Sequence, residues 1–218
     1  MGGFDLAVLA HNLPFLAAGM WVTLQLTVLA VLGGMAIGTV LAVMRLSALK
    51  PLSWAVAAYV NFLRSMPLIL VIFWFYTLVP KLIGRPVSGF YSVLIAFVMF
   101  EAAYYSEIIR AGISSVRRGQ ISAAMALGLT KMQAMRYVIL PQAVRNMMPV
   151  LLTQSIIMLQ DTSLVYVVGL RDFLTSADIV ASRDNRPTEL YLFVAIVFLV
   201  VCFSASRLAN RLRRRYAL

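Results

Sequence analysis

The sequence is poor in charge, cysteine and histidine, and each shortage argues against a class of protein. Only 12% of its 218 residues are charged, about half the fraction expected of a soluble domain of this length. The single cysteine, Cys202, excludes a disulfide within the chain. The single histidine, His11, has no metal-ligand or nucleophile–base spacing around it, which argues against an enzyme. No G-x-x-x-x-G-K-S/T sequence occurs, so we do not expect the chain to hydrolyse ATP itself.

Long apolar runs dominate instead, and 62% of the residues are hydrophobic. A helix needs about 20 apolar residues to cross a bilayer. Five runs meet this requirement, at 15–44, 54–79, 88–112, 146–170 and 189–209. The first run is too long for a signal peptide and has no basic region before it, so it is predicted to be retained. The chain is therefore predicted to be an all-α integral membrane protein with about five transmembrane helices.

The net charge of +11 is distributed unevenly along the chain. Five spans place the two ends on opposite sides of the membrane. If the N-terminus is outside, most of the 19 Lys and Arg residues lie inside, and the outer segments hold only Lys81, Arg85, Arg171, Arg183 and Arg186. The positive-inside rule therefore predicts an N-terminus outside and a C-terminus inside. The basic excess is typical of a membrane rim that faces water or lipid phosphate, not of nucleic-acid binding.

No linker divides the chain, so residues 1–218 are predicted to form one domain. Gly33, Gly34 and Gly38 in the first span have a spacing that favours close contact between helices in lipid. The segment 171–187 lies on the outer side of the spanned membrane, and it is predicted to form a short helix along the surface of that membrane.

The loop between the third and fourth spans, residues 113–145, is polar, basic and rich in helix-forming residues, and we call it the polar loop. Gly119 and Gly128 divide it into two short helices. The second helix is expected to carry an apolar stripe of Leu129, Met132, Met135 and Val138. Leu140–Pro141 is expected to end it, because the residue before a proline avoids helical conformation.

Three interpretations of the polar loop can be compared. A helix–glycine–helix elbow with small side chains suits insertion into a groove of a partner protein, here a cytoplasmic motor subunit. The pattern also resembles a DNA-binding helix-turn-helix, but roughly 30 residues between two spans are too few for such a domain. The third interpretation is an amphipathic surface helix without a partner. We favour the docking site.

The sequence of the polar loop resembles a motif of a known protein family. The run Gly119-Gln120, Ala123-Ala124, Ala126-Leu127-Gly128 and Ile139-Leu140-Pro141-Gln142-Ala143, with Arg145, looks like the "EAA" loop of type I ABC importer permeases of the polar amino-acid branch. Arg64-Ser65-Met66-Pro67-Leu68 and Asp161-Thr162-Ser163-Leu164 resemble two further segments of that branch. The resemblance covers about 19–212 and implies an ATP-binding-cassette (ABC) permease fold, with the polar loop as the coupling helix.

By this resemblance the contacts to the ATP-binding subunit are Gly119, Ala123, Ala124, Leu127 and Gly128. The chain departs from the family pattern at two positions. Ser122 replaces the glutamate that names the loop motif, and Gln160 precedes Asp161 where lysine is frequent. The string Glu101-Ala102-Ala103 lies inside the third span and is not the loop motif.

Charged residues inside a span are costly and are usually functional or paired. Asp161, with the hydroxyls of Thr162 and Ser163, could bind the α-carboxylate or α-ammonium group of an amino acid, or it could anchor a neighbouring helix. Arg64 could clamp a carboxylate, or it could extend to lipid phosphate. Glu101 is a third candidate, for which Arg64 is a plausible partner. Glu107 and Arg110 have the spacing of a local ion pair.

The sequence thus predicts a non-catalytic permease subunit of a binding-protein-dependent ABC importer of polar amino acids in the bacterial inner membrane. Glutamate or aspartate as substrate follows from the resemblance alone. Expected partners are an ATP-binding subunit dimer, a second identical or similar permease, a periplasmic or surface-tethered binding protein and membrane lipid. No cofactor, metal or nucleic acid is expected on this chain, since ATP-Mg would bind to the ATPase. The alternative is an ion-coupled secondary carrier in which Asp161 or Glu101 couples transport to an ion.

Overall fold

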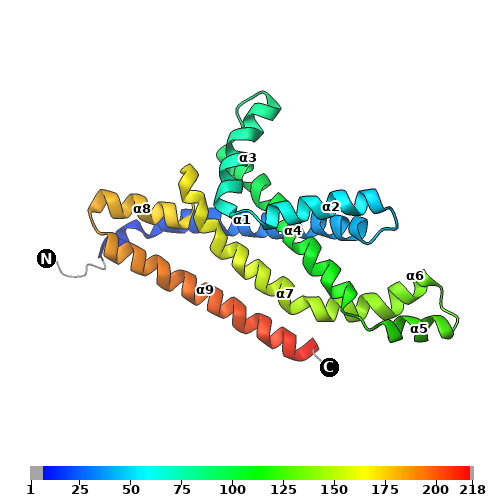
Figure 1. Ribbon diagram of the computed structural model, residues 1–218. Helices are drawn as coiled ribbons and strands as arrows, with labels where there is room; N and C mark the ends of the chain where they lie inside the picture. Colours follow the sequence, from blue (N-terminus) through cyan, green and yellow to red (C-terminus); the bar gives the residue numbers. More distant parts are fainter. Residues whose placement is uncertain (1–6, 217–218) are drawn as a thin grey trace.

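The computed structural model describes the backbone of residues 7–216 and the side chains of residues 7–211. Within this part of the chain every regular element is a helix (Figure 1). The α-helices are α1 Ala7–Arg45, α2 Lys50–Arg64, α3 Leu68–Ile83, α4 Gly89–Ser114, α5 Arg118–Ala126, α6 Lys131–Ala134, α7 Leu140–Asp161, α8 Phe173–Asp184 and α9 Pro187–Tyr216. A π-helix, Met135–Ile139, joins α6 to α7, and a 3₁₀-helix, Thr162–Val168, follows α7. The all-α prediction is confirmed.

Four helical stretches are long and apolar enough to cross a membrane, and a fifth crossing exists if α2 and α3 together form one span. This agrees with the predicted number, but the prediction of a continuous second span over 54–79 is wrong. α2 and α3 are bent by 109° relative to each other. The break lies at Ser65–Pro67, where Pro67 is extended, with φ −61° and ψ 132°. Proline keeps the residue before it out of helical conformation, so the helix cannot run through Met66–Pro67.

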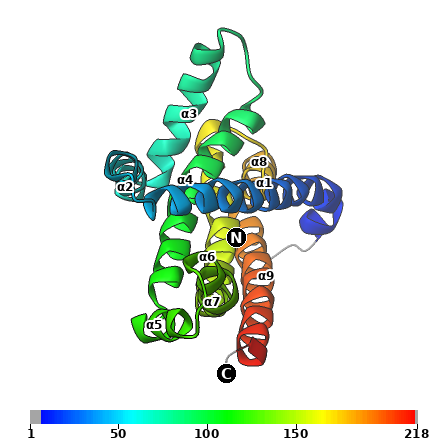
Figure 2. The same ribbon diagram turned by 90° about the vertical axis from the view of Figure 1, so that its right-hand side faces the viewer.

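The centre of the fold is α4, against which α1, α2, α3 and α7 all pack (Figures 1 and 2). Leu26 of α1, Val60 of α2 and Ile72 of α3 are buried with Phe97 of α4 in the main apolar cluster. Since lipid is as apolar as these side chains, such helices associate mainly through close packing. The position of α4 therefore depends on how closely its neighbours can approach.

The glycines of α1 provide this close approach. A Cβ atom built on Gly34 would lie 2.6 Å from the Cβ of Glu101, and one built on Gly38 would lie 2.8 Å from the Cβ of Tyr105. A Cβ on Gly33 would lie 2.9 Å from a methyl group of Val98. The prediction of close helix contact at these glycines is confirmed, and the partner helix is α4.

A second cluster fastens α8 to α1 and α9 at the end of the molecule where α1 begins (Figure 1). Asp172 is the N-cap of α8, and its carboxylate accepts hydrogen bonds from the backbone N–H groups of Leu174 and Thr175. The buried Thr23 of α1 accepts a hydrogen bond from the N–H of Phe173, 3.1 Å away. The short helix predicted within 171–187 is confirmed.

Candidate functional site

The polar loop forms a bent projection, and it lies at the same end of the molecule as the end of α9 (Figures 1 and 2). After α5, Gly128 has φ +83°, a left-handed conformation that glycine adopts without strain. Thr130 and Gln133 then form a capping box that starts α6: the Thr130 hydroxyl accepts from the N–H of Gln133, and the Gln133 side chain accepts from the N–H of Thr130. The predicted turn at Gly128 between two short helices is confirmed.

Most of the residues that the resemblance implicates in docking face outward. Gly119, Ala123, Leu127 and Gly128 are exposed, and the Leu127 side chain is 83% exposed. Ala124 differs, because it is only 3% exposed and packs inward. Leu127 is therefore accessible to a partner protein that approaches this face. The role of these residues stays a prediction, and Ala124 can support the surface but cannot present its own side chain to a partner in this conformation.

The predicted apolar stripe of the second helix is split between the interior and the surface. Leu129 and Val138 are half-buried, whereas Met132 is 76% exposed. A small apolar cluster of Val116, Ile139 and Ala143 fixes the base of the polar loop to α7. The tip of the polar loop thus projects from a packed base, and Met132 is accessible for contact with a partner.

The prediction that Leu140–Pro141 ends the helix is wrong. Leu140 is helical, with φ −60° and ψ −43°, and the chain continues from the π-helix directly into α7. Pro141 lies at the first turn of α7, where the missing N–H of a proline is tolerated, and the π-helix directly precedes it. The side-chain amide of Gln142 donates to the carbonyl of Val138 at 2.9 Å. The projection is therefore continuous with the spanning helix α7.

Glu101 is fully buried on α4, and its partner is Gln154 of α7. The side-chain amide of Gln154 donates to both carboxylate oxygens of Glu101, at 3.0 and 3.3 Å. The plausible Glu101–Arg64 pair is not formed, because the guanidinium of Arg64 lies over the ring of Tyr104, 5.4 Å from its centroid. Sequence reasoning missed Gln154, although an amide inside a span is itself a signal, since polar side chains commonly bridge helices in lipid.

Arg64 lines a cavity of about 420 Å³ between α4 and α7. Its polar lining also includes Tyr104, Glu107, Asn146 and Gln154. This volume is within the usual range of small-molecule sites. Gln154 thus touches the cavity on one side and Glu101 on the other, and Arg64 is the predicted substrate residue that the structure places in the cavity wall.

The other predicted substrate residues are arranged differently. The hydroxyl of Thr162, a fully buried residue, donates to the carbonyl of Leu159 at 2.6 Å, and the hydroxyl of Ser163 donates to that of Gln160 at 2.7 Å. Asp161 is half-buried at the end of α7, and among the described side chains none forms a hydrogen bond or ion pair with it. The sequence neighbours Asp161, Thr162 and Ser163 therefore do not form one polar site in this conformation.

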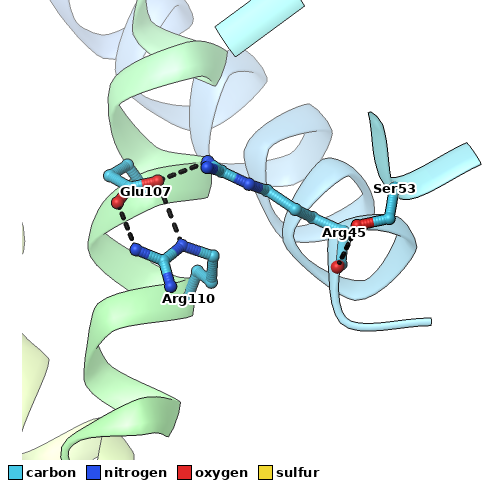
Figure 3. Close-up of polar contacts among 4 residues, drawn as sticks. All are labelled: Arg45, Ser53, Glu107 and Arg110. Atoms are coloured by element: carbon cyan, nitrogen blue, oxygen red, sulfur yellow. Dashed lines mark hydrogen bonds and ion pairs between the residues drawn. The ribbon is translucent and has the colours of Figure 1, made fainter. Parts of the chain in front are cut away.

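Glu107 is the centre of an ion cluster in the C-terminal part of α4 (Figure 3). Its carboxylate accepts hydrogen bonds from Arg110 on the same helix and from Arg45 at the end of α1. Ser53 of α2 donates to the carbonyl of Arg45 at 2.8 Å. The predicted Glu107–Arg110 pair is confirmed, and the additional Arg45 contact joins α1, α2 and α4 at the wall of the cavity.

No metal centre emerges from this arrangement. Among the described residues, no three His, Cys, Asp or Glu side chains come together in a way that could hold a metal ion. The polar groups instead form hydrogen bonds between helices and line the cavity between α4 and α7.

Comparison with known proteins decides the family. Residues 10–218 match the family model described as "Binding-protein-dependent transport system inner membrane component". The chain belongs to this family. It is 49% identical to the glutamate/aspartate import permease protein GltK of Escherichia coli O6:H1, over 98% of this chain and 99% of that protein. It is 36% identical to the probable glutamine ABC transporter permease protein GlnM of Bacillus subtilis, over 97% of each chain.

A solved structure agrees with these relatives. The chain superposes on a chain of the crystal structure of an amino acid ABC transporter with histidines, with a TM-score of 0.91, 35% identity, and 97% of this chain and 98% of that chain covered. The prediction of an inner-membrane permease subunit is confirmed. An ion-coupled carrier and a DNA-binding helix-turn-helix both disagree with membership of this family.

Proposed function

We propose that this chain is a permease subunit of an ATP-driven, binding-protein-dependent importer whose substrates are glutamate and aspartate. The observation that carries the proposal is the 49% identity to the GltK glutamate/aspartate permease along almost the whole of both chains. The subunit has no catalytic step of its own, and ATP-Mg binds to the partner ATPase. It works with a second permease chain, an ATP-binding subunit dimer and an amino-acid-binding protein outside the membrane.

The polar loop is the docking element for the ATPase. Leu127 and Met132 are exposed apolar side chains at the tip of the projection, and Gly119 and Gly128 leave open space in which a partner surface can approach. Because the helix continues from the loop into α7, a movement of the tip is transmitted to a helix that lines the cavity. With the polar loop in the cytoplasm, the C-terminus lies inside and the N-terminus and α8 lie outside.

The cavity between α4 and α7 is the section of the pathway that this subunit contributes. Arg64 supplies a planar cation that can hold a carboxylate through two hydrogen bonds, which suits an acidic amino acid. Gln154 can turn its amide between Glu101 and a substrate. Asp161 borders the outer end of α7, where its unpaired carboxylate can receive the α-ammonium group as the pathway opens outward.

The test is reconstitution of the chain with its co-encoded ATPase, permease and binding protein in proteoliposomes. We expect ATP-dependent uptake of radiolabelled glutamate and aspartate, and at least tenfold less uptake of glutamine and histidine at equal concentration, because Arg64 in the cavity wall can pair with a side-chain carboxylate but not with a neutral side chain. ATP-independent uptake driven by an ion gradient would refute the proposal. Uptake of glutamine in preference to glutamate would refute the acidic substrate alone.

The docking element has a matched pair of variants. Gly128 and Gly84 both have positive φ, +83° and +72°, and a Cβ on either would meet nothing within 4 Å. The variants Gly128→Asp and Gly84→Asp therefore introduce the same backbone strain and the same charge at opposite ends of the molecule. We expect Gly128→Asp to insert normally but to lose the co-purifying ATPase and transport, whereas Gly84→Asp retains both. Equal ATPase recovery from the two variants would contradict the docking role.

A further inference from the structure

A second cavity, of about 540 Å³, lies at the start of α7 and is separate from the cavity between α4 and α7. We call it the basic groove. It is lined by two arginines and four apolar residues, namely Arg136, Leu140, Pro141, Val144, Arg145 and Met148. None of these residues lines the cavity that contains Arg64. The basic groove is therefore not part of the candidate substrate pathway.

The arginines of the basic groove lack an acidic partner. Both are exposed, and no described side chain forms an ion pair with either of them. The guanidinium of Arg136 lies 5.8 Å from the ring centroid of its neighbour Tyr137. Arg45 and Arg110, by contrast, share the carboxylate of Glu107. Two exposed guanidinium groups beside one cavity attract an anion, and phosphate suits their planar donors particularly well.

The rest of the groove is apolar and follows the helix axis. Leu140, Val144 and Met148 are four residues apart, so they lie along one side of α7 over about 12 Å. The apolar run of the fourth span begins near residue 146, so Arg136 lies at the water end of the basic groove, Leu140 and Val144 lie at the level of the lipid head groups, and Met148 lies at the lipid end. A ligand with an anionic head and a long apolar tail complements this sequence of charges and side chains.

We propose that the basic groove binds an anionic phospholipid, with its phosphate between Arg136 and Arg145 and an acyl chain along Leu140, Val144 and Met148. A soluble anion would leave the apolar wall in water, and an uncharged lipid would leave both arginines without a counter-ion. The bound lipid braces the π-helix Met135–Ile139, through which the polar loop continues into α7. Coupling of ATP hydrolysis to transport is therefore expected to require anionic lipid.

The measurement is native mass spectrometry of the purified transporter complex in nanodiscs of phosphatidylcholine with increasing phosphatidylglycerol. The double variant Arg136→Gln/Arg145→Gln is compared with the double variant Arg117→Gln/Arg118→Gln, which removes two exposed arginines of the same loop that do not line the groove. We expect the first to reduce the affinity for phosphatidylglycerol about thirtyfold, which corresponds to about 1 kcal/mol for each arginine. The second should leave it within about threefold, well under one tenfold step of 1.4 kcal/mol.

Further arms identify the source of the phosphate and test the tail. Inorganic phosphate at millimolar concentration should not displace the lipid, and Leu140→Gln should weaken lipid binding with both arginines intact. Displacement by phosphate would overturn the lipid assignment in favour of a free anion. Equal lipid retention in the two double variants would also overturn the lipid assignment. Loss of the ATPase subunit from Arg136→Gln/Arg145→Gln in pure phosphatidylcholine would overturn it as well, because the two arginines would then be contacts to the ATPase.

The lipid site rests on the proposed permease function, but the lipid site and the acidic substrate are tested by different measurements. Glutamate uptake by the wild-type complex tests the substrate, whatever the lipid. In phosphatidylglycerol, Arg136→Gln/Arg145→Gln should keep its preference for glutamate over glutamine and show a lower transport rate. A changed preference in that variant would mean that the groove belongs to the substrate pathway, and this would overturn the lipid site.

Discussion

Gly38→Ala is the substitution for which the structure gives the sharpest expectation. The added methyl group would lie 2.8 Å from the Cβ of Tyr105, 2.9 Å from the carbonyl oxygen of Ala102 and 3.0 Å from the backbone nitrogen of Ser106. Two of these three atoms belong to the backbone of α4 and cannot rotate away. α1 and α4 must therefore separate by a few tenths of an ångström along their closest contact.

Such overpacking typically costs about 1–3 kcal/mol. In a chain of this length each kcal/mol lowers the midpoint of thermal unfolding by about 2–4 °C, so Gly38→Ala should lower the Tm by about 2–12 °C. Gly33→Ala should cost less, since its methyl group meets only side-chain atoms of Val98. Gly119→Ala is the neutral control, because nothing lies within 4 Å of its Cβ and alanine is the better helix former.

The assay is thermal unfolding of the three purified variants in one detergent, followed by the intrinsic fluorescence of their tryptophans. The expected order of Tm is Gly119→Ala at or above wild type, then Gly33→Ala, then Gly38→Ala. A Gly38→Ala protein that melts with the wild type would refute the claim that backbone contact at this glycine holds α1 on α4. Equal losses at Gly33 and Gly38 would refute the distinction between a side-chain clash and a backbone clash.

Two further predictions concern charged residues. Glu107→Gln should lower the free energy of unfolding by about 1–3 kcal/mol, because Arg45 and Arg110 lose the carboxylate they share, and Arg110→Gln should cost less; an unchanged Tm for Glu107→Gln would contradict this. Asp172→Ala should cost about 0.5–2 kcal/mol as the loss of an N-cap, whereas Asp172→Asn keeps the cap. Burial raises the pKa of the Asp172 carboxyl, so folding favours its protonated form, and this contribution to stability is lost as the pH rises through the raised pKa. Wild type should therefore gain stability relative to Asp172→Asn as the pH is lowered from 7 toward 4, and parallel pH profiles would contradict it.

The features that sequence predicted correctly depend on local chemistry. The length of an apolar run defines a span wherever its helix packs, and Gly34 predicts close approach whichever helix its partner is. The elbow follows from Gly128, and the structure adds the capping box of Thr130 and Gln133, which also forms within four residues. These signals are contained in a few neighbouring residues, so no knowledge of the tertiary structure is needed to interpret them.

The two errors about helix ends have one physical cause, since both concern a proline. Pro67 separates α2 from α3, although hydropathy is the same for a straight span and a bent one. Pro141 does not end its helix, and Pro14 and Pro149 also lie inside helices, within α1 and α7. Whether a proline ends a helix depends on whether neighbouring groups satisfy the carbonyl that loses its N–H donor, and a single sequence does not report those neighbours.

The polar contacts around the cavity are the hardest feature to predict because the residues that form them are distant in sequence. Glu101 is paired with Gln154, 53 residues away, and Arg45 with Glu107, 62 residues away. A search for charges inside spans finds Glu101 and Arg64 but passes over the neutral amide that connects the first to the cavity. Whether Gln154 faces α4, lipid or the cavity depends on the rotation of α7 about its axis. That rotation is set by contacts such as the one between Gly112 and Met147, whose Cβ lies 2.8 Å from the position of a Gly112 Cβ. A cavity built between two helices is therefore specified by the packing that holds their rotation, and Gly112 and Met147, which set this packing, themselves line the cavity.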